Sequence, residues 1–267
     1  MKYKAIISDL DGTLLNSDHK ISEYTKQVIE KVINKGVKFF IATGRHHEDI
    51  DFVRNGLNLD SIFITSNGGR IHDKDKNKLI GHDIDEEIVK GLINLDIEED
   101  IHKNIYMENE WYIEKENDYL DDFVKDSPFL YQITDLKTLE NIKSHKVFFL
   151  SLEHEKLVDL KERIEKLYPG KLNITFSLDT CLEVMPKGVS KGYAIKEVLK
   201  RHNISLEETI AFGDGLNDLE MLKTVGKGYI MENAHDKLIK ELPNHEIIGP
   251  NTEDGLGKKL EEIFDIK

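Results

Sequence analysis

The spacing of apolar residues near the start of the chain predicts a strand followed by a helix. Residues 5–7 are apolar without polar alternation, which is typical of a strand buried on both faces. Residues 21–35 instead place apolar side chains three or four positions apart, which predicts an amphipathic helix. Ser22 is suited to cap the start of this helix, and Gly36 is suited to end it.

The alternation of strand and helix continues as far as residue 65. Two further apolar runs, 37–42 and 61–65, predict strands, and the stretch from about residue 45 to residue 56 predicts a helix between them. Strands that alternate with helices in this way form parallel sheets covered by helices. We therefore expect an α/β fold with a doubly wound parallel sheet.

The pattern changes in the middle of the chain, where hairpins replace the alternation. Polar residues at 73–78 and 108–110 interrupt apolar stretches and predict hairpins over 70–83 and 104–114. The other elements predicted here are helices at 85–95 and 155–168 and strands at 147–152, 172–177 and 182–185. This mixture predicts a separate α+β unit over residues 82–186.

After residue 186 the strand and helix alternation returns. Ser190 is suited to cap a helix over 191–202, and residues 209–212 form another short apolar strand. The later predicted elements are a helix ending at Leu222, a strand at 228–231, a helix at 236–242, a strand at 246–248 and a helix at 256–264. We thus predict a core domain of residues 1–81 and 187–267, interrupted by an inserted cap domain of residues 82–186.

Composition and charge exclude several classes of function. The 267 residues carry a net charge of −14, which disfavours binding to nucleic acids and to anionic membranes. No apolar run approaches the about 18 residues of a membrane span, and the first apolar stretch is too short for a signal peptide. Cys181 is the only cysteine, so an internal disulfide is impossible. We expect a buried thiol and a cytoplasmic protein.

Polar side chains follow three of the predicted strands. Asp9 and Asp11 follow the first strand, Thr43 and Gly44 the second, and Asp214, Asn217 and Asp218 the strand over 209–212. In an open α/β sheet, ligands bind beyond the carboxyl ends of the strands, so we expect these residues to converge. Gathered carboxylates are costly unless a cation neutralises them. Because the site would be made of oxygen ligands, Mg²⁺ is the favoured ion.

The same strand ends supply groups that can hold an anion. Thr43, the amides beside Gly44 and the side chain of Asn217 can donate hydrogen bonds, while Lys191 adds a positive charge at a predicted helix start. Phosphoryl transfer requires this combination, because its developing charge must be neutralised in place. Enzymes accelerate the slowest such reactions by up to ~10²¹-fold, whereas acid–base catalysis supplies only ~10²–10⁴. An aspartate nucleophile would help by dividing the reaction into two easier steps.

The motifs of this chain resemble those of the haloacid dehalogenase superfamily in order and spacing. They are Asp9-Leu10-Asp11-Gly12-Thr13, Thr43-Gly44-Arg45, Lys191 and Gly213-Asp214-Gly215-Leu216-Asn217-Asp218. Over its whole length the chain resembles the Cof-type phosphatases, whose type IIB cap lies between the second and third motifs. Gly69, where such proteins often have alanine, is a small departure.

The resemblance implies a role for each motif residue. Asp9 would be the nucleophile, and Asp11 would protonate the leaving oxygen and then deprotonate the attacking water. Mg²⁺ would be bound by Asp9, by the main-chain carbonyl of Asp11 and by Asp214. The phosphate would be held by Leu10 (through its amide), Thr43, Gly44, Lys191 and Asn217. Asp218 would orient Lys191 or a metal-bound water rather than bind the metal itself.

Residues beside the motifs allow more than one interpretation. His46 and His47 are expected to be surface residues of a first helical turn, with substrate contact as the alternative. Arg45 could serve the anion site or only start the helix. Trp111 and Tyr112 could line the substrate face of the cap, although an aromatic residue in a hairpin is more often packed in a core.

The leading prediction is a Mg²⁺-dependent phosphatase that hydrolyses small phosphorylated metabolites, sugar phosphates first, through an aspartyl-phosphate. One alternative is a phosphohexose mutase, which must grip a second phosphate in its cap. Arginines suit that task, but Arg163 is the only arginine between residues 82 and 186. The other alternative is a non-catalytic protein that binds a phosphate ligand, although every motif side chain is present.

Overall fold

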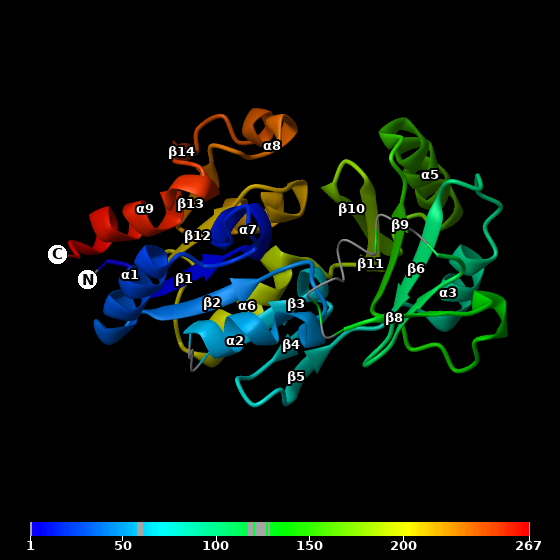
Figure 1. Ribbon diagram of the computed structural model, residues 1–267, viewed down its shortest axis with the longest axis horizontal. Coiled ribbons are helices and arrows are strands. Elements are labelled where there is room, and N and C mark those ends of the chain that lie inside the picture. The colour runs from blue at the N-terminus through cyan, green and yellow to red at the C-terminus, as the bar shows by residue number, and fades with distance from the viewer. Residues whose placement is uncertain (1, 58–60, 117–119, 121–126, 128, 267) are drawn as a thin grey trace.

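The computed structural model describes residues 2–57, 61–116, 120, 127 and 129–266, which form two sheets that lie side by side in Figure 1. The first sheet has the strand order β14 (Glu246–Ile248), β13 (Lys227–Met231), β12 (Thr209–Gly213), β1 (Ala5–Ser8), β2 (Lys38–Ala42), β3 (Phe63–Thr65), β4 (Arg70–His72) and β5 (Lys78–Gly81). The strands from β14 to β3 run parallel, and β4 and β5 add an antiparallel edge.

Helices cover both faces of this first sheet, and alternate residues of β1 point to each face. Ile6 packs in a hydrophobic cluster with Val28 and Leu260, whereas Ile7 packs in a second cluster with Ile195 and Leu222. The first cluster includes residues of helices α1 (Glu23–Asn34), α2 (Asp51–Leu57) and α9 (Gly255–Phe264). The second cluster includes residues of helices α6 (Lys191–Arg201), α7 (Leu219–Thr224) and α8 (Asp236–Glu241). The predicted doubly wound α/β fold is therefore confirmed.

The second sheet belongs to the middle of the chain. Its strand order is β10 (Leu172–Leu178), β11 (Cys181–Pro186), β9 (Lys146–Leu150), β6 (His102–Tyr106), β7 (Trp111–Ile113) and β8 (Tyr131–Ile133). Helices α3 (Glu86–Ile93) and α5 (His154–Leu167) pack with it around one hydrophobic cluster. Its aromatic side chains Tyr106, Trp111 and Phe148 form another cluster, in which Trp111 is 2% exposed. Trp111 is thus packed in a core, and Cys181 is buried beside it as expected.

The two sheets draw on different parts of the chain. Strands of the first sheet come from residues 5–81 and 209–248, and those of the second come from 102–186. The boundaries of the core and cap domains, between residues 81 and 82 and between 186 and 187, stay a prediction. Within those predicted domains, residues 1, 58–60, 117–119, 121–126, 128 and 267 lie outside the described part of the chain.

Helix ends follow the capping residues that the sequence offers. Ser22 Oγ accepts a hydrogen bond from the amide of Thr25, and Ser190 Oγ accepts one from the amide of Tyr193, each over 3.0 Å. Gly36 follows α1 with a φ of 89°, a conformation that glycine adopts without strain. None of the described helices combines the length and the apolar character that crossing a membrane demands.

Two local predictions differ from the structure. The helix expected from residue 45 begins later, with the short turn η2 (His47–Ile50) leading into α2, because the imidazole of His46 accepts a hydrogen bond from the amide of Glu48 and caps the turn. Strand β8 is not predicted by the pattern, since it is a short edge strand that pairs with β7. The other short turns are η1 (Leu10–Leu14), η3 (Ser66–Gly68), η4 (Leu136–Thr138), η5 (Leu216–Asp218) and η6 (Asn251–Glu253).

Candidate active site

The candidate site begins where β1 ends and the chain turns sharply at Gly12. Gly12 has a φ of 74°, and a β-carbon at this position would collide with the carboxylate of Asp214. Only glycine therefore fits here, since it combines the positive φ with the close approach. The next residue, Thr13, donates a 2.6 Å hydrogen bond from Oγ1 to Asp214 Oδ1. This turn brings the loop after β1 against the loop after β12.

Lys191 joins the acidic residues of these two loops. It is the first residue of α6, its side chain is fully buried, and its Nζ donates to Asp9 Oδ1 and to Asp218 Oδ1, both over 2.7 Å. Burial and the charge of Asp218 raise the pKa of Asp9 well above its usual range, although Lys191 acts in the opposite direction. Burial opposes the charge of Lys191, but Asp218 and Asp9 raise its pKa, so the ammonium group stays protonated.

Three carboxylates lie close enough to share a cation. Asp9, Asp214 and Asp218 each offer an oxygen, and these oxygens lie within 4.8 Å of one another. Asp218 is engaged on both oxygens, because Oδ1 accepts from Lys191 and Oδ2 accepts from the amides of Asp214 and Gly215 at 3.0 Å. The hydrogen bonds of Asp9 and Asp214 within the described residues engage only Oδ1 of each side chain.

This arrangement fits a hard divalent cation. Burial, with a contribution from Asp218, raises the pKa of Asp214 to about 7, so its ionised form lacks a sufficient counter-charge. A set of carboxylate oxygens is the donor set that Mg²⁺ prefers. Asp9 and Asp214 are suited to bind it directly, whereas the engaged Asp218 is suited to position Lys191.

The carboxylate of Asp11 lies outside that cluster because it pairs with Arg45. Arg45 Nε donates to Asp11 Oδ2 and Nη2 donates to Oδ1, both over 2.7 Å, and Nη1 reaches Asp49 Oδ2 at 3.1 Å. Burial opposes ionisation, but these hydrogen bonds from Arg45 hold the pKa of Asp11 well below its usual range. Arg45 therefore lies before the helical turn and does not begin it, and its guanidinium keeps Asp11 as a carboxylate.

The predicted phosphate-binding residues lie around this charged centre. Thr43 is buried, and its Oγ1 accepts a hydrogen bond from the amide of Arg45 at 3.1 Å. Asn217 and Lys191 line a cavity of about 190 Å³ together with residues of the cap strands β10 and β11, and Asp9 and Asp214 are not among its lining residues. The side chain of Leu10 is buried in the core cluster, which leaves its main chain for the proposed role. Phosphate binding by these residues stays a prediction.

Two buried cap residues reach this loop cluster and are not among the predicted site residues. Lys146 Nζ donates to Glu183 Oε1 and to the carbonyl of Gly44, both over 2.7 Å. Glu183 also accepts from Asn67 Nδ2, and Asn67 Oδ1 accepts from Asn217 Nδ2 at 3.0 Å. A signal does exist in the sequence, because Glu183 is a lone charge within the apolar run 182–185 and Lys146 directly precedes the apolar run 147–150.

The expectation that His46 and His47 lie on the surface is wrong. Their exposed fractions are 0% and 3%. The ring of His46 stacks on Phe129 with centroids 3.9 Å apart, and its Nε2 lies 3.1 Å from the carbonyl of Met107. Both partners belong to the middle of the chain, so the burial comes from residues that local sequence patterns do not relate to this turn.

Comparisons with known proteins agree with this geometry. The sequence model of the haloacid dehalogenase-like hydrolase family matches residues 6–260. A Buchnera aphidicola (subsp. Baizongia pistaciae) protein with a provisional phosphatase name is 38% identical over 263 residues, 98% of each chain. An HMP-PP phosphatase of Yersinia pseudotuberculosis is 33% identical over 258 residues, 97% of this chain and 94% of that protein.

A solved structure has the same fold throughout. It is described as a HAD subclass IIB sugar phosphatase, and it superposes with a TM-score of 0.85, covering 98% of this chain and all of its own at 24% identity. The family resemblance inferred from the motifs is thereby confirmed, together with the inserted cap and the phosphatase class. The chain belongs to the haloacid dehalogenase-like hydrolases and is a Cof-type phosphatase of that family.

Proposed function

We propose that this phosphatase is Mg²⁺-dependent and hydrolyses small phosphorylated metabolites through an aspartyl-phosphate on Asp9. The observation that carries the proposal is the buried lysine that contacts two carboxylates at once, with a third beside them. Three acidic side chains around one ammonium group leave excess negative charge in a buried place. Such an arrangement is costly for stability and is therefore typical of a functional site.

The contact of Lys191 supports a different task for each oxygen of Asp9. Lys191 occupies Oδ1 of Asp9, so Oδ2 is the oxygen that attacks phosphorus. Its bond to phosphorus forms as the bond from phosphorus to the ester oxygen breaks. Mg²⁺ bound by Asp9, Asp214 and the carbonyl of Asp11 would neutralise the charge on the transferred phosphoryl oxygens.

In this proposal Asp11 moves the two protons of the reaction. As an acid it gives its proton to the leaving ester oxygen, and as a base it takes a proton from the water that hydrolyses the aspartyl-phosphate. Arg45 holds Asp11 as a carboxylate, so the carboxyl group has to separate from the guanidinium before it can carry a proton. The products are the alcohol, inorganic phosphate and free Asp9.

The names of similar proteins favour a small phosphorylated substrate. One relative is named for HMP-PP and one structural neighbour for sugar phosphates. We therefore propose hexose phosphates and HMP-PP as the first compounds of a substrate panel.

Turnover of p-nitrophenyl phosphate with Mg²⁺ tests the proposal. The wild-type protein should release p-nitrophenol, and Asp9→Asn should not, whereas the exposed variant Asp75→Asn should match the wild type. An acid quench should trap a phosphoryl group on Asp9 of the wild-type protein. Equal turnover by wild type and Asp9→Asn would refute the mechanism.

The two alternatives give different results in the same panel. A phosphohexose mutase would interconvert hexose 1- and 6-phosphates, but Arg163, the only cap arginine, is exposed and bonds the carbonyl of Asp96. A non-catalytic binding protein would bind phosphate without any turnover. A cytoplasmic location and the absence of nucleic-acid partners stay predictions.

A further inference from the structure

A second cluster of possible metal ligands lies at the boundary between the first sheet and the cap. His47 lies in η2, His72 lies in β4, and Glu108 lies in the turn between β6 and β7 of the cap. One ring nitrogen of each histidine and one oxygen of Glu108 lie within 4.8 Å of one another. The candidate active site uses none of these three residues.

The two histidines are buried and incompletely bonded. They are 3% and 2% exposed, and their rings stack with centroids 4.2 Å apart. Within the described part of the chain, Nδ1 of each ring is buried without a hydrogen-bond partner. Unpaired buried polar atoms are rare and costly, and two of them in one place indicate a ligand that the protein atoms alone do not supply.

The protonation state of the pair suits a metal ion. Burial lowers the pKa of His47 to about 4 and that of His72 to about 3. These values already include the positive charges of Arg54 and Arg70, which lower both, and the negative charge of Glu108, which raises both. Both imidazoles are therefore neutral near pH 7, which is the form that binds metals without first losing a proton.

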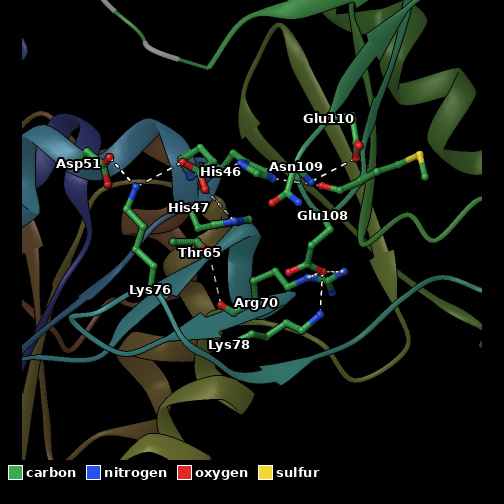
Figure 2. Close-up of polar contacts among 12 residues, drawn as sticks. His46, His47, Asp51, Thr65, Arg70, Lys76, Lys78, Glu108, Asn109 and Glu110 are labelled. Carbon is green, nitrogen blue, oxygen red and sulfur yellow. Dashed lines mark hydrogen bonds and ion pairs between the residues drawn. The ribbon is translucent and has the colours of Figure 1, made fainter.

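The carboxylates nearby complete a ligand set. Glu108 accepts hydrogen bonds from Arg70 Nε at 3.0 Å and from Lys78 Nζ at 2.8 Å, both through Oε2 (Figure 2). Oε1 has no hydrogen bond within the described residues. Arg70 also pairs with Asp83 at 2.5 Å, so Glu108 is not its sole counter-charge.

Glu48 has the position of an orienting group for His47. Its Oε1 lies 3.5 Å from His47 Nε2, on the nitrogen opposite the unpaired Nδ1. Histidines that bind metals through one nitrogen commonly direct the other toward a carboxylate, which sets the tautomer and the ring orientation.

We propose that His47, His72 and Glu108 bind a divalent transition ion, for which Zn²⁺ is the best match, and that this ion fastens the cap to the core. Two imidazoles and one carboxylate form a common ligand set of Zn²⁺, with a fourth position for water. Both histidines come from the core side and Glu108 comes from the cap hairpin. The bound ion holds that hairpin against η2 and β4.

Zinc binding in the presence of excess Mg²⁺ tests the proposal. Untagged protein is stripped with EDTA, dialysed into millimolar Mg²⁺ and titrated with Zn²⁺, with bound metal counted by elemental analysis. We expect one equivalent of Zn²⁺ that Mg²⁺ does not displace. His72→Gln and Glu108→Gln should each lower the Zn²⁺ affinity by more than about 10–100-fold, which is the loss expected when a group that only orients a metal ligand is removed.

Two matched variants guard against indirect effects. His102→Gln removes a partly buried cap histidine whose Nδ1 also lacks a partner, and Glu110→Gln changes another carboxylate of the same hairpin. Both should bind Zn²⁺ like the wild type. Co²⁺ should give visible absorption bands in the wild type that His72→Gln lacks.

Two results would overturn the proposal. One is the absence of a Mg²⁺-resistant Zn²⁺ equivalent, and the other is equal Zn²⁺ affinity in His72→Gln and His102→Gln. If His72→Gln does not fold, Glu108→Gln against Glu110→Gln decides the question, because Glu108 is a partly exposed turn residue.

Discussion

A buried charged cluster of the core and a buried charged pair of the cap differ in their balance of positive and negative groups. In the core, Lys191 faces Asp9 and Asp218 directly, with Asp214 next to them, so one positive charge faces three negative ones. In the cap, Glu183 is the one ion-pair partner of Lys146 among the described residues. The core cluster therefore needs a further cation before all its members can ionise, whereas the cap pair is balanced without one.

This difference in charge balance indicates two roles: catalysis for the core cluster and positioning of loops for the cap pair. The unbalanced cluster lies where Mg²⁺ would add positive charge and where a phosphoryl group would add and later remove negative charge. The balanced pair reaches the main chain of Gly44 and, through Asn67, the side chain of Asn217. It is thus suited to hold the loops that would grip the phosphate. Loss of a core charge should lower kcat, and loss of a cap charge should mainly raise KM.

Removal of the core lysine should have the largest effect. Lys191→Met leaves Asp9 and Asp218 buried and unpaired, which should cost about 3–5 kcal/mol of unfolding free energy. The loss of a charge that stabilises the transition state should lower kcat by at least about 10²–10³-fold. Urea unfolding and steady-state kinetics measure the two quantities. Lys196→Met, an exposed change on the same helix, serves as the control and should alter neither.

Removal of the cap carboxylate should have a smaller effect on catalysis. Glu183→Gln keeps the shape of the side chain but removes the partner charge of Lys146, so the Gly44 and Asn67 contacts loosen. We expect KM to rise about 10-fold, equivalent to about 1.4 kcal/mol of binding energy, with a lesser change in kcat. The exposed cap variant Glu155→Gln should behave as wild type. A loss confined to kcat would contradict the proposed division of roles.

Arg45 offers a test of proton transfer at the core site. In Arg45→Gln the pKa of Asp11 should rise by about 1–3 units, the range over which an adjacent arginine lowers an aspartate. In the profile of kcat/KM against pH, the limb that reports the pKa of Asp11 should shift to higher pH by that amount. Arg201→Gln, at the exposed end of α6, should leave the profile unchanged. The experiment needs an alkyl phosphate, whose poor leaving group requires the acid.

Metal-free protein should show a shift in Tm with pH, which is an effect on stability and not on turnover. The pKa of Asp214 is about 7 in the folded state, above the about 3.9 of an unfolded chain. The folded state therefore binds more protons between these values, and stability falls as pH rises from about 4 to about 7. For a chain of this size, 1 kcal/mol corresponds to about 2–4 °C. Saturating Mg²⁺ or the Asp214→Asn substitution should flatten the dependence of Tm on pH. A steeper fall of Tm with pH in the presence of Mg²⁺ would contradict this prediction.

The core could be predicted from the sequence because its signals are local. The run 5–7, the turn at Gly12 and the cap at Ser190 each identify an element within a few residues. The rule that ligands bind at the carboxyl ends of parallel strands then brings Asp9 and Asp214 together, and the predicted helix start after Ser190 adds Lys191. The structure places these three in one cluster.

The cap contacts could not be predicted in the same way. Lys146 meets Glu183 because β9 pairs with β11, and this pairing depends on turn lengths and on sheet register. His46 is buried by Phe129 and Met107, more than sixty residues further along the chain. Neither hydrophobic periodicity nor a motif relates such positions, so the sequence offers only the charges of Glu183 within one apolar run and of Lys146 before another.

The central place of β1 also has a consequence for how the protein is made. This strand pairs with β2 on one side and with β12 on the other, and β12 begins at Thr209. On the ribosome the cap residues emerge before that second partner, so the cap can fold as a unit while β1 still has one bare edge. The catalytic half of the molecule is thus completed last. In the meantime, chaperones that recognise exposed apolar strands would find their target in residues 5–8.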